Sequence, residues 1–298
     1  MKTPSPHVLF CSLAFCLTGC GGSSGPASPV SPAPPGSTAV VPPQGNYSPN
    51  WKSHMSAGDE ALRQHRYPQA EKQYLAALAE AEKFGPDDPL VARTLHCLAD
   101  ALRGQQRYAE AEKLVKRSLT IKEKTMAPDN PNLAPTLTSL ALLAQDQQHY
   151  EEAESLHKRT IELLEKSNGT GDNEVGAALN RLGELYMTEG KYREAEASFE
   201  RALASWEKSW GADHPQLIVV LINLGKARMQ LDRPADAEPL FARAAILAEK
   251  RLLPDHPLLA ESLENQAEAL RKAGKTEEAA KLQARAQAIR VKKPGSGK

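Results

Sequence analysis

The side chains that could carry out chemistry are few in this sequence, and they form no known catalytic pattern. There is no Gly-rich phosphate loop, no His-Glu-x-x-His pair, no Gly-x-Ser-x-Gly elbow and no EF-hand loop. Acidic residues are plentiful, but most fall on helical columns where a solvated face explains them. We therefore expect no enzymatic activity, no cofactor and no metal ion.

Cysteine chemistry is concentrated at the start of the chain. Three of the four cysteines, Cys11, Cys16 and Cys20, lie within the first twenty residues, and only Cys97 belongs to the body of the protein. A lone thiol cannot form an intramolecular disulfide, and no Cys/His cluster has the spacing of a zinc site. Since no His or Lys partner that would lower the pKa of its thiol is evident in the sequence, we interpret Cys97 as an inert packed residue.

Residues 1–19 have the parts of an export signal, with Lys2 near the start, an apolar run over residues 8–17 and small residues before Cys20. Ten apolar residues reach only about 15 Å as a helix, about half of a bilayer's hydrocarbon core. The run from Leu17 to Cys20 resembles the bacterial lipobox, in which the signal is cut before a cysteine that then carries the lipid. We predict lipidation of Cys20; an ordinary cleaved signal with an unrelated cysteine is the alternative.

The next segment, residues 20–50, is rich in Gly, Ser, Pro and Ala and carries little charge. Such a composition cannot build a core and predicts a flexible linker behind the lipidated cysteine. By resemblance to lipoproteins of Gram-negative bacteria, Gly21 rather than Asp after the cysteine favours the outer membrane. The expected location is the cell envelope, lipid-anchored and facing the periplasm if the host is Gram-negative.

Composition predicts an all-α body and excludes one class of partner. The chain has 298 residues, with 37 Lys and Arg against 37 Asp and Glu. Because the formal net charge is zero, overall electrostatics do not favour binding to nucleic acid. Hydrophobic residues make up 41% of the sequence, which is enough for a core. From about residue 55 onward, Ala, Leu, Glu, Gln, Lys and Arg dominate, and these are strong helix formers.

An internal repeat organises this body. Small residues recur every 41 or 42 residues, and an alanine follows each of them after twelve residues. Small residues allow two helices to approach closely, so the columns predict six helical hairpins. The first column is Gly58, Ala99, Ala141, Gly183, Gly225 and Ala267, and the second is Ala70, Ala111, Ala153, Ala195, Ala237 and Ala279.

Residues that end or begin helices mark the limits of the hairpins. Gly190 is placed to end a helix in the left-handed conformation. Most unit boundaries carry a Pro after a capping residue, as in Asp88-Pro89. At the last two boundaries His214 and His256 precede the Pro; we interpret them as boundary residues rather than ligands and expect the aspartates one residue earlier to support the caps. The boundary at residues 168–173 has no Pro, which suggests a local hinge.

These columns, with an aromatic residue four beyond the alanine and a further alanine seven beyond it, resemble the tetratricopeptide repeat. The long period and the Asp-His-Pro punctuation are similar to the variant found in kinesin light chains and their bacterial relatives. The resemblance covers residues 51–290 and implies a right-handed α-solenoid of about six helix-turn-helix repeats with a concave binding face. The implied units are 51–88, 89–130, 131–173, 174–214, 215–256 and 257–290, followed by a disordered basic tail at 291–298.

Helical phase identifies candidate binding residues. Positions two or six before the small column and one after it are expected to face the concave side. In tetratricopeptide domains that hold peptides, an Asn two before the small residue often binds the ligand backbone, and Asn223 and Asn265 match that position. In the first four units this position is occupied by Ser56, Cys97, Ser139 and Arg181. The family's clamp for a C-terminal carboxylate is therefore not reproduced. The candidate ligand-binding residues are Arg93, Asp100, Leu142, Arg181, Glu184, Val219, Asn223, Lys226 and Asn265.

Two functional classes remain open after this reading. The first is a membrane-anchored scaffold that binds a protein or peptide segment in the groove, with a role in envelope assembly by resemblance to similar lipoproteins. The second is a self-associating structural module, or a soluble adaptor if the lipobox is false.

Overall fold

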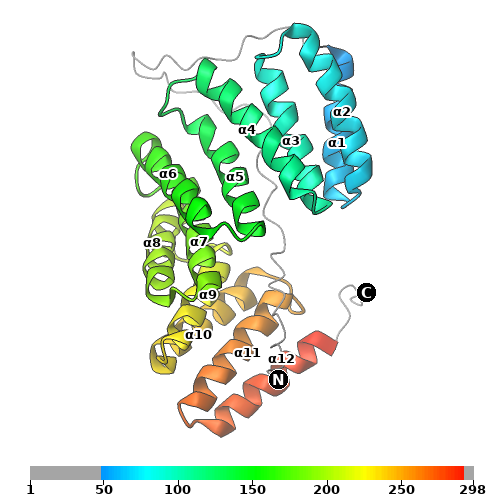
Figure 1. Ribbon diagram of the computed structural model, residues 1–298. Helices are drawn as coiled ribbons and strands as arrows, with labels where there is room; N and C mark the ends of the chain where they lie inside the picture. Colours follow the sequence, from blue (N-terminus) through cyan, green and yellow to red (C-terminus); the bar gives the residue numbers. More distant parts are fainter. Residues whose placement is uncertain (1–47, 292–298) are drawn as a thin grey trace, which may run out of the picture.

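The computed structural model describes residues 48–291, and within them it contains helices and no strand. Twelve α-helices follow one another as six antiparallel pairs along a curved path (Figure 1). The expected all-α solenoid is therefore confirmed. The helices are α1 Pro49–Arg63, α2 Tyr67–Ala81, α3 Pro89–Gly104, α4 Tyr108–Thr125, α5 Ala134–Asp146, α6 Tyr150–Asn168, α7 Asn173–Glu189, α8 Tyr192–Trp210, α9 Leu217–Gln230, α10 Pro234–Arg251, α11 Pro257–Lys272 and α12 Thr276–Val291, with short 3-10 turns at Glu82–Phe84 and Pro131–Leu133.

Capping side chains begin the first helix of several units. The carboxylate of Asp88 accepts a hydrogen bond from the backbone N–H of Leu90, which satisfies one of the free amides of α3. At the last boundary the ring of His256 performs this function, since its Nδ1 accepts from the N–H of Leu258. The supporting role expected for Asp213 is wrong, because its carboxylate pairs with Lys250 instead.

The turn inside each pair uses a left-handed residue. Gly190 has φ 75° and ψ 11°, as expected for a helix-ending glycine. At the corresponding place in four other units the chain adopts positive φ with a residue other than glycine. These are His65 (φ 55°), Gln106 (φ 62°), Gln148 (φ 64°) and Asp232 (φ 57°).

The core of each pair is built by fitting a small residue against a large one. Gly183 of α7 lies directly under the ring of Phe199 of α8, and Gly58 lies in the same way under Tyr74. Phe199 and Tyr74 are fully buried. The two alanine-rich faces thus pack closely only because the glycine leaves room for the ring.

The boundary without a Pro is fastened by side chains of α8. Ser205 Oγ donates to the carbonyl oxygen of Asp172 over 2.7 Å, and Trp206 Nε1 donates to that of Asn173 over 2.8 Å. Ser209 Oγ donates to the carbonyl oxygen of Gly171 over 2.5 Å. Three bonds to successive carbonyls hold this loop in place where a hinge was expected.

Successive units are joined on the even-numbered helices by a repeated ion pair, which we call the Arg–Glu ladder. A Glu near the end of one even-numbered helix, or in the 3-10 turn after α2, pairs with an Arg 35 or 36 residues later on the next even-numbered helix. Most of these side chains are exposed, so each pair contributes little alone. The ladder consists of Glu82–Arg117, Glu123–Arg159, Glu165–Arg201, Glu207–Arg243 and Glu249–Arg285, with N–O distances of 2.6 to 3.0 Å.

The odd-numbered helices lie on the inner side of the curve. They contact the odd-numbered helix of the next unit at α1–α3, α3–α5, α7–α9 and α9–α11, as expected where a curved stack is tightest. Among the described helices, none has the length and apolar character needed to cross a membrane.

Candidate interaction face

The nine candidate residues all lie on odd-numbered helices, from α3 to α11. Arg93 is exposed, and the other eight are half-buried. Together they form the inner face of the stack, a name used below for these nine side chains. These side chains are polar, charged and apolar, and they are at least partly exposed.

A hydrogen-bonded network links the fourth and fifth units on the inner face. Asn180 Nδ2 donates to Glu184 Oε1 over 2.8 Å, and Asn223 Nδ2 reaches the same oxygen over 3.4 Å. Asn223 Nδ2 also donates to Asn180 Oδ1 over 3.2 Å. The Asn proposed to bind a ligand backbone therefore has its amide nitrogen directed to its own chain.

Burial raises the pKa of Glu184, while the amide donors of Asn180 and Asn223 and the charge of Arg181 act in the opposite direction. Removal from water is the larger effect because it disfavours the ionised carboxylate. The centre of the inner face therefore carries a carboxyl group that is protonated more easily than an ordinary glutamate.

The fifth and sixth units are joined by a second polar link. Lys226 Nζ pairs with Glu261 Oε1 over 2.6 Å, and Asn265 Nδ2 donates to the backbone carbonyl of Glu261 over 2.8 Å. Glu261 was not among the candidates, although it lies six residues before Ala267 and satisfies the same spacing rule. Asn180, three residues before Gly183, was outside that rule.

The N-terminal part of the inner face carries a cation, Arg93, and a half-buried carboxylate, Asp100, that lies near the ring of His96. The guanidinium of Arg93 lies over the ring of Trp51, 5.6 Å from its centroid. His96 Nε2 is 3.8 Å from Asp100 Oδ2. Burial lowers the pKa of His96 and raises that of Asp100, so both changes disfavour the charged pair.

Apolar contact area comes from Leu142 and Val219, which are half-buried on α5 and α9. Cys97 is 5% exposed, in agreement with a packed thiol. The described residues contain no group of three or more His, Cys, Asp or Glu placed to hold a metal ion. The geometry is suited to contact with another chain along an extended surface.

Comparison with known families decides the classification. The tetratricopeptide repeat model matches residues 57–124, 90–166, 174–237 and 220–290, well over half of the sequence. The chain belongs to the tetratricopeptide repeat family. Members of this family are in general binding scaffolds without catalytic activity. A comparison with proteins of curated function gave no significant match.

Several solved structures share this fold. A putative kinesin light chain with nearly identical repeats from Podosopora anserina is 24% identical, with a TM-score of 0.61 over 68% of this chain and 96% of that one. BtubC from P. vanneervenii is 18% identical, with a TM-score of 0.64 over 84% and 92%. PilW, a type IV pilus biogenesis factor, is 19% identical, with a TM-score of 0.58 over 81% and 94%. Because all three sequence identities are below 25%, the similarity shows a common fold and nothing more.

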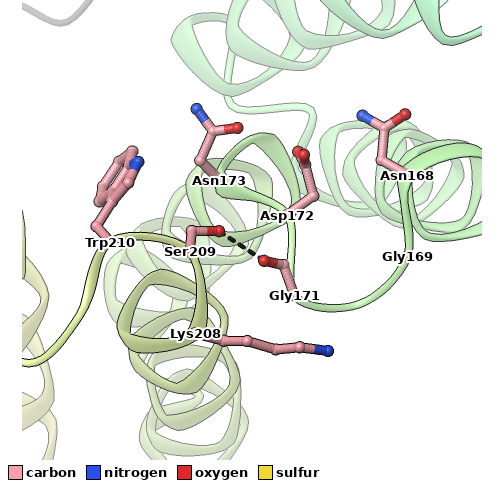
Figure 2. Close-up of a pocket in the computed structure, with 8 residues that line it drawn as sticks. All are labelled: Asn168, Gly169, Gly171, Asp172, Asn173, Lys208, Ser209 and Trp210. Carbon is pink, nitrogen blue, oxygen red and sulfur yellow. Dashed lines mark hydrogen bonds between the residues drawn. The ribbon is translucent and has the colours of Figure 1, made fainter. Parts of the chain in front are cut away.

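One cavity lies at the third unit boundary of the tetratricopeptide body, outside the inner face. It has a volume of about 430 Å³ and is lined by residues 168, 169, 171–173 and 208–210 (Figure 2). At three other boundaries a lysine pairs with an aspartate of the preceding loop, as Lys124 does with Asp87 over 2.9 Å. Here Gly171 stands in the place of that aspartate, and the side chain of Lys208 extends past it. The cavity is lined mainly by polar groups, and the hydroxyl of Ser209 in its wall donates to the backbone carbonyl of Gly171.

Proposed function

We propose that this tetratricopeptide protein is a membrane-anchored scaffold that binds a protein or peptide segment on its inner face, in the service of envelope assembly. The observation that carries the proposal is the inner face itself. Nine half-buried or exposed side chains on successive odd-numbered helices present amides, charges and apolar surface along one curve. Such a mixture fits an amphipathic segment of another chain.

The ends of the stack argue against one form of self-association, the head-to-tail stacking of copies. Val291 stands where units one to five carry the Glu of the Arg–Glu ladder, and it is 82% exposed. Ala76 stands where units two to six carry the Arg. A second copy stacked on either end would find no ladder partner, and the end helix α12 has Gln287 where the inner units carry Leu, Ile or Ala.

The binding proposal is tested by capturing the partner through crosslinking in intact envelopes and then measuring its affinity for purified variants. Arg181→Ala with Asn223→Ala should weaken binding by ~1–3 kcal/mol, since hydrogen bonds and charge on the inner face are lost. The matched control is Arg193→Ala with Gln230→Ala, which removes the same chemical groups from exposed positions in the same two units. Equal affinity of both double variants, each folded, would place the binding site elsewhere.

The membrane anchor is proposed on the sequence alone, because Cys20 lies outside the described residues. Two or more acyl chains give stable anchoring, where a single chain gives marginal binding. Cys20→Ser should move the protein from the membrane fraction to the soluble fraction. Retention of the variant on membranes after a high-salt wash would exclude lipidation as the main anchor.

Self-association is distinguished from scaffold function by sedimentation of the purified protein. The scaffold proposal expects a monomer with its inner face open. A tight symmetric oligomer that buries the inner face would favour the structural module instead.

A further inference from the structure

His157 is a histidine in the core of the third unit with nothing to bond to. It lies on α6, is fully buried, and neither Nδ1 nor Nε2 has a hydrogen-bond partner. A buried polar group without a partner costs free energy, and a buried charge costs far more. The ring is therefore held in its uncharged form by its surroundings.

The repeat shows that this position is aromatic or aliphatic in four of the other five units, and the sixth unit carries Gln283 there. It lies four residues beyond the column alanine, where the first, fourth and fifth units carry Tyr74, Phe199 and Phe241 and the second carries Val115. All four of these residues are fully buried. An imidazole at this place is thus a polar, titratable substitute for rings that only pack, as Phe199 and Phe241 do, whereas the hydroxyl of Tyr74 donates to Asp59 over 2.7 Å.

The surroundings of His157 offer no group to stabilise a positive charge. The charged group that faces it is Arg181 of α7, whose positive charge opposes protonation of the ring. The other helix of its unit, α5, has no ionisable side chain from Ala134 to Gln145. Protonation would place a cation in an apolar core beside a second cation.

We propose that His157 makes the third unit acid-sensitive, because a protonated ring must leave the core and in doing so loosens the packing of α5, α6 and α7. This inference rests on the proposed function in one respect: α7 carries Arg181 and Glu184 of the inner face. Acidification would therefore disturb the inner face at its centre, and binding would weaken in the same pH range.

The direction of the pH dependence follows from linkage. Burial lowers the pKa of His157 to about 4, from an ordinary value of 6.5. Between these values the unfolded chain binds a proton that the folded chain does not, so stability is lost as the pH falls from 6.5 towards 4. At pH 5 the equilibrium constant for opening should have risen on the order of 10-fold through this residue alone.

The test compares the full chain with a variant that gives the third unit the pairing of the fourth, Ala141→Gly with His157→Phe. Hydrogen exchange of α5 and α6 is measured at pH 7 and pH 5 with correction for intrinsic rates, and α9 and α10 are the internal reference. In the natural chain, protection of α5 and α6 should fall on the order of 10-fold more than in the variant. An equal loss in both proteins would overturn the proposal.

A direct measurement keeps the test decisive if that variant does not fold. Titration of the His157 ring by NMR should show no protonation above pH 5 in the folded chain, and His157→Gln should remove the acid-dependent loss of protection. A ring that titrates near pH 6.5 would overturn the inference. Neither measurement needs the binding partner. A failure of the inference about His157 would therefore leave the proposed scaffold function unaffected.

Discussion

The ring of Phe199 occupies the place where a Cβ on Gly183 would lie, since an ideal Cβ there would be 2.5 Å from Cε1 of the ring. Gly58 and Tyr74 repeat this relationship at the same distance. Where the facing residue is Val115 or His157, the small residue is an alanine instead. A glycine in the column of small residues therefore accompanies a Phe or Tyr ring on the facing helix, and an alanine accompanies the smaller Val or His.

Gly183→Ala should destabilise the fold by ~1–3 kcal/mol, because the added methyl group overpacks the contact with Phe199. Urea unfolding measures the loss. Adding Phe199→Val, which gives the pairing of the second unit, should make the effect of the alanine much smaller. The same cost of Gly183→Ala in both backgrounds would contradict direct contact as its cause.

Ala195→Leu should also cost roughly 1–3 kcal/mol. Ala195 is fully buried in the alanine column, so a longer side chain must push the two helices of the fourth unit apart. Glu194→Ala, one residue away and exposed, should change stability by no more than about 0.5 kcal/mol. Thermal unfolding of the two variants provides the comparison, and equal midpoints would refute the assigned face.

Gln148→Gly should stabilise the chain. Gln148 has φ 64°, a conformation that costs a residue with a Cβ roughly 1–2 kcal/mol relative to glycine, partly offset by the greater freedom of glycine in the unfolded chain. We expect a gain of about 0.5–1 kcal/mol in urea unfolding. Gly190→Gln, the reverse change in the next unit, should lose a similar amount, and a loss in both variants would show that φ does not decide the outcome.

Glu154 should make stability depend on pH in the acidic range. Its carboxylate accepts from Lys158 over 2.6 Å, from Lys191 over 3.1 Å and from Tyr186 Oη over 3.0 Å. The hydrogen bond from Lys158 is the largest of the causes that lower the pKa of Glu154, from 4.5 to about 2. A lowered pKa stabilises the fold above pH 4.5, and that contribution is lost as the pH falls through 2.

Glu154→Gln should therefore lower stability at pH 7 by about 1 kcal/mol and flatten its dependence on pH between 4.5 and 2. Urea unfolding at pH 7 and pH 3 measures both effects. Glu151→Gln, at an exposed position on the same helix, is the control. A loss that is as large at pH 3 as at pH 7 would show that the charge of Glu154 is not responsible.

The fold was accessible from the sequence because its signals are local or periodic. The column of Gly183 and the column of Ala195 recur with a period close to 42, and each helix needs only its own face and the next helix to form. Gly190 ended its helix as predicted for the same reason. At the boundary between the fourth and fifth units, however, the ion pair of Asp213 with Lys250 could not be foreseen from capping propensity, because it depends on a residue of the next unit.

The inner face was only partly predictable. Helical phase placed Asn223 and Glu184 on the same side, because phase is a property of one helix. Their hydrogen bonds depend on Asn180, which lies 43 residues before Asn223 and on another helix than Asn223. Sequence spacing cannot give the distance between two side chains on helices whose separation is set by packing.

Periodicity in the sequence by itself determined six helical pairs, their faces and their stacking, since these follow from the spacing of small and apolar residues. Only the tertiary structure decided that the loop of residues 168–173 is held by α8 and that His157 is left without a partner. Both outcomes depend on which polar atoms of different helices meet once water is excluded. That is a property of packed pairs of elements, and no single segment of the sequence carries it.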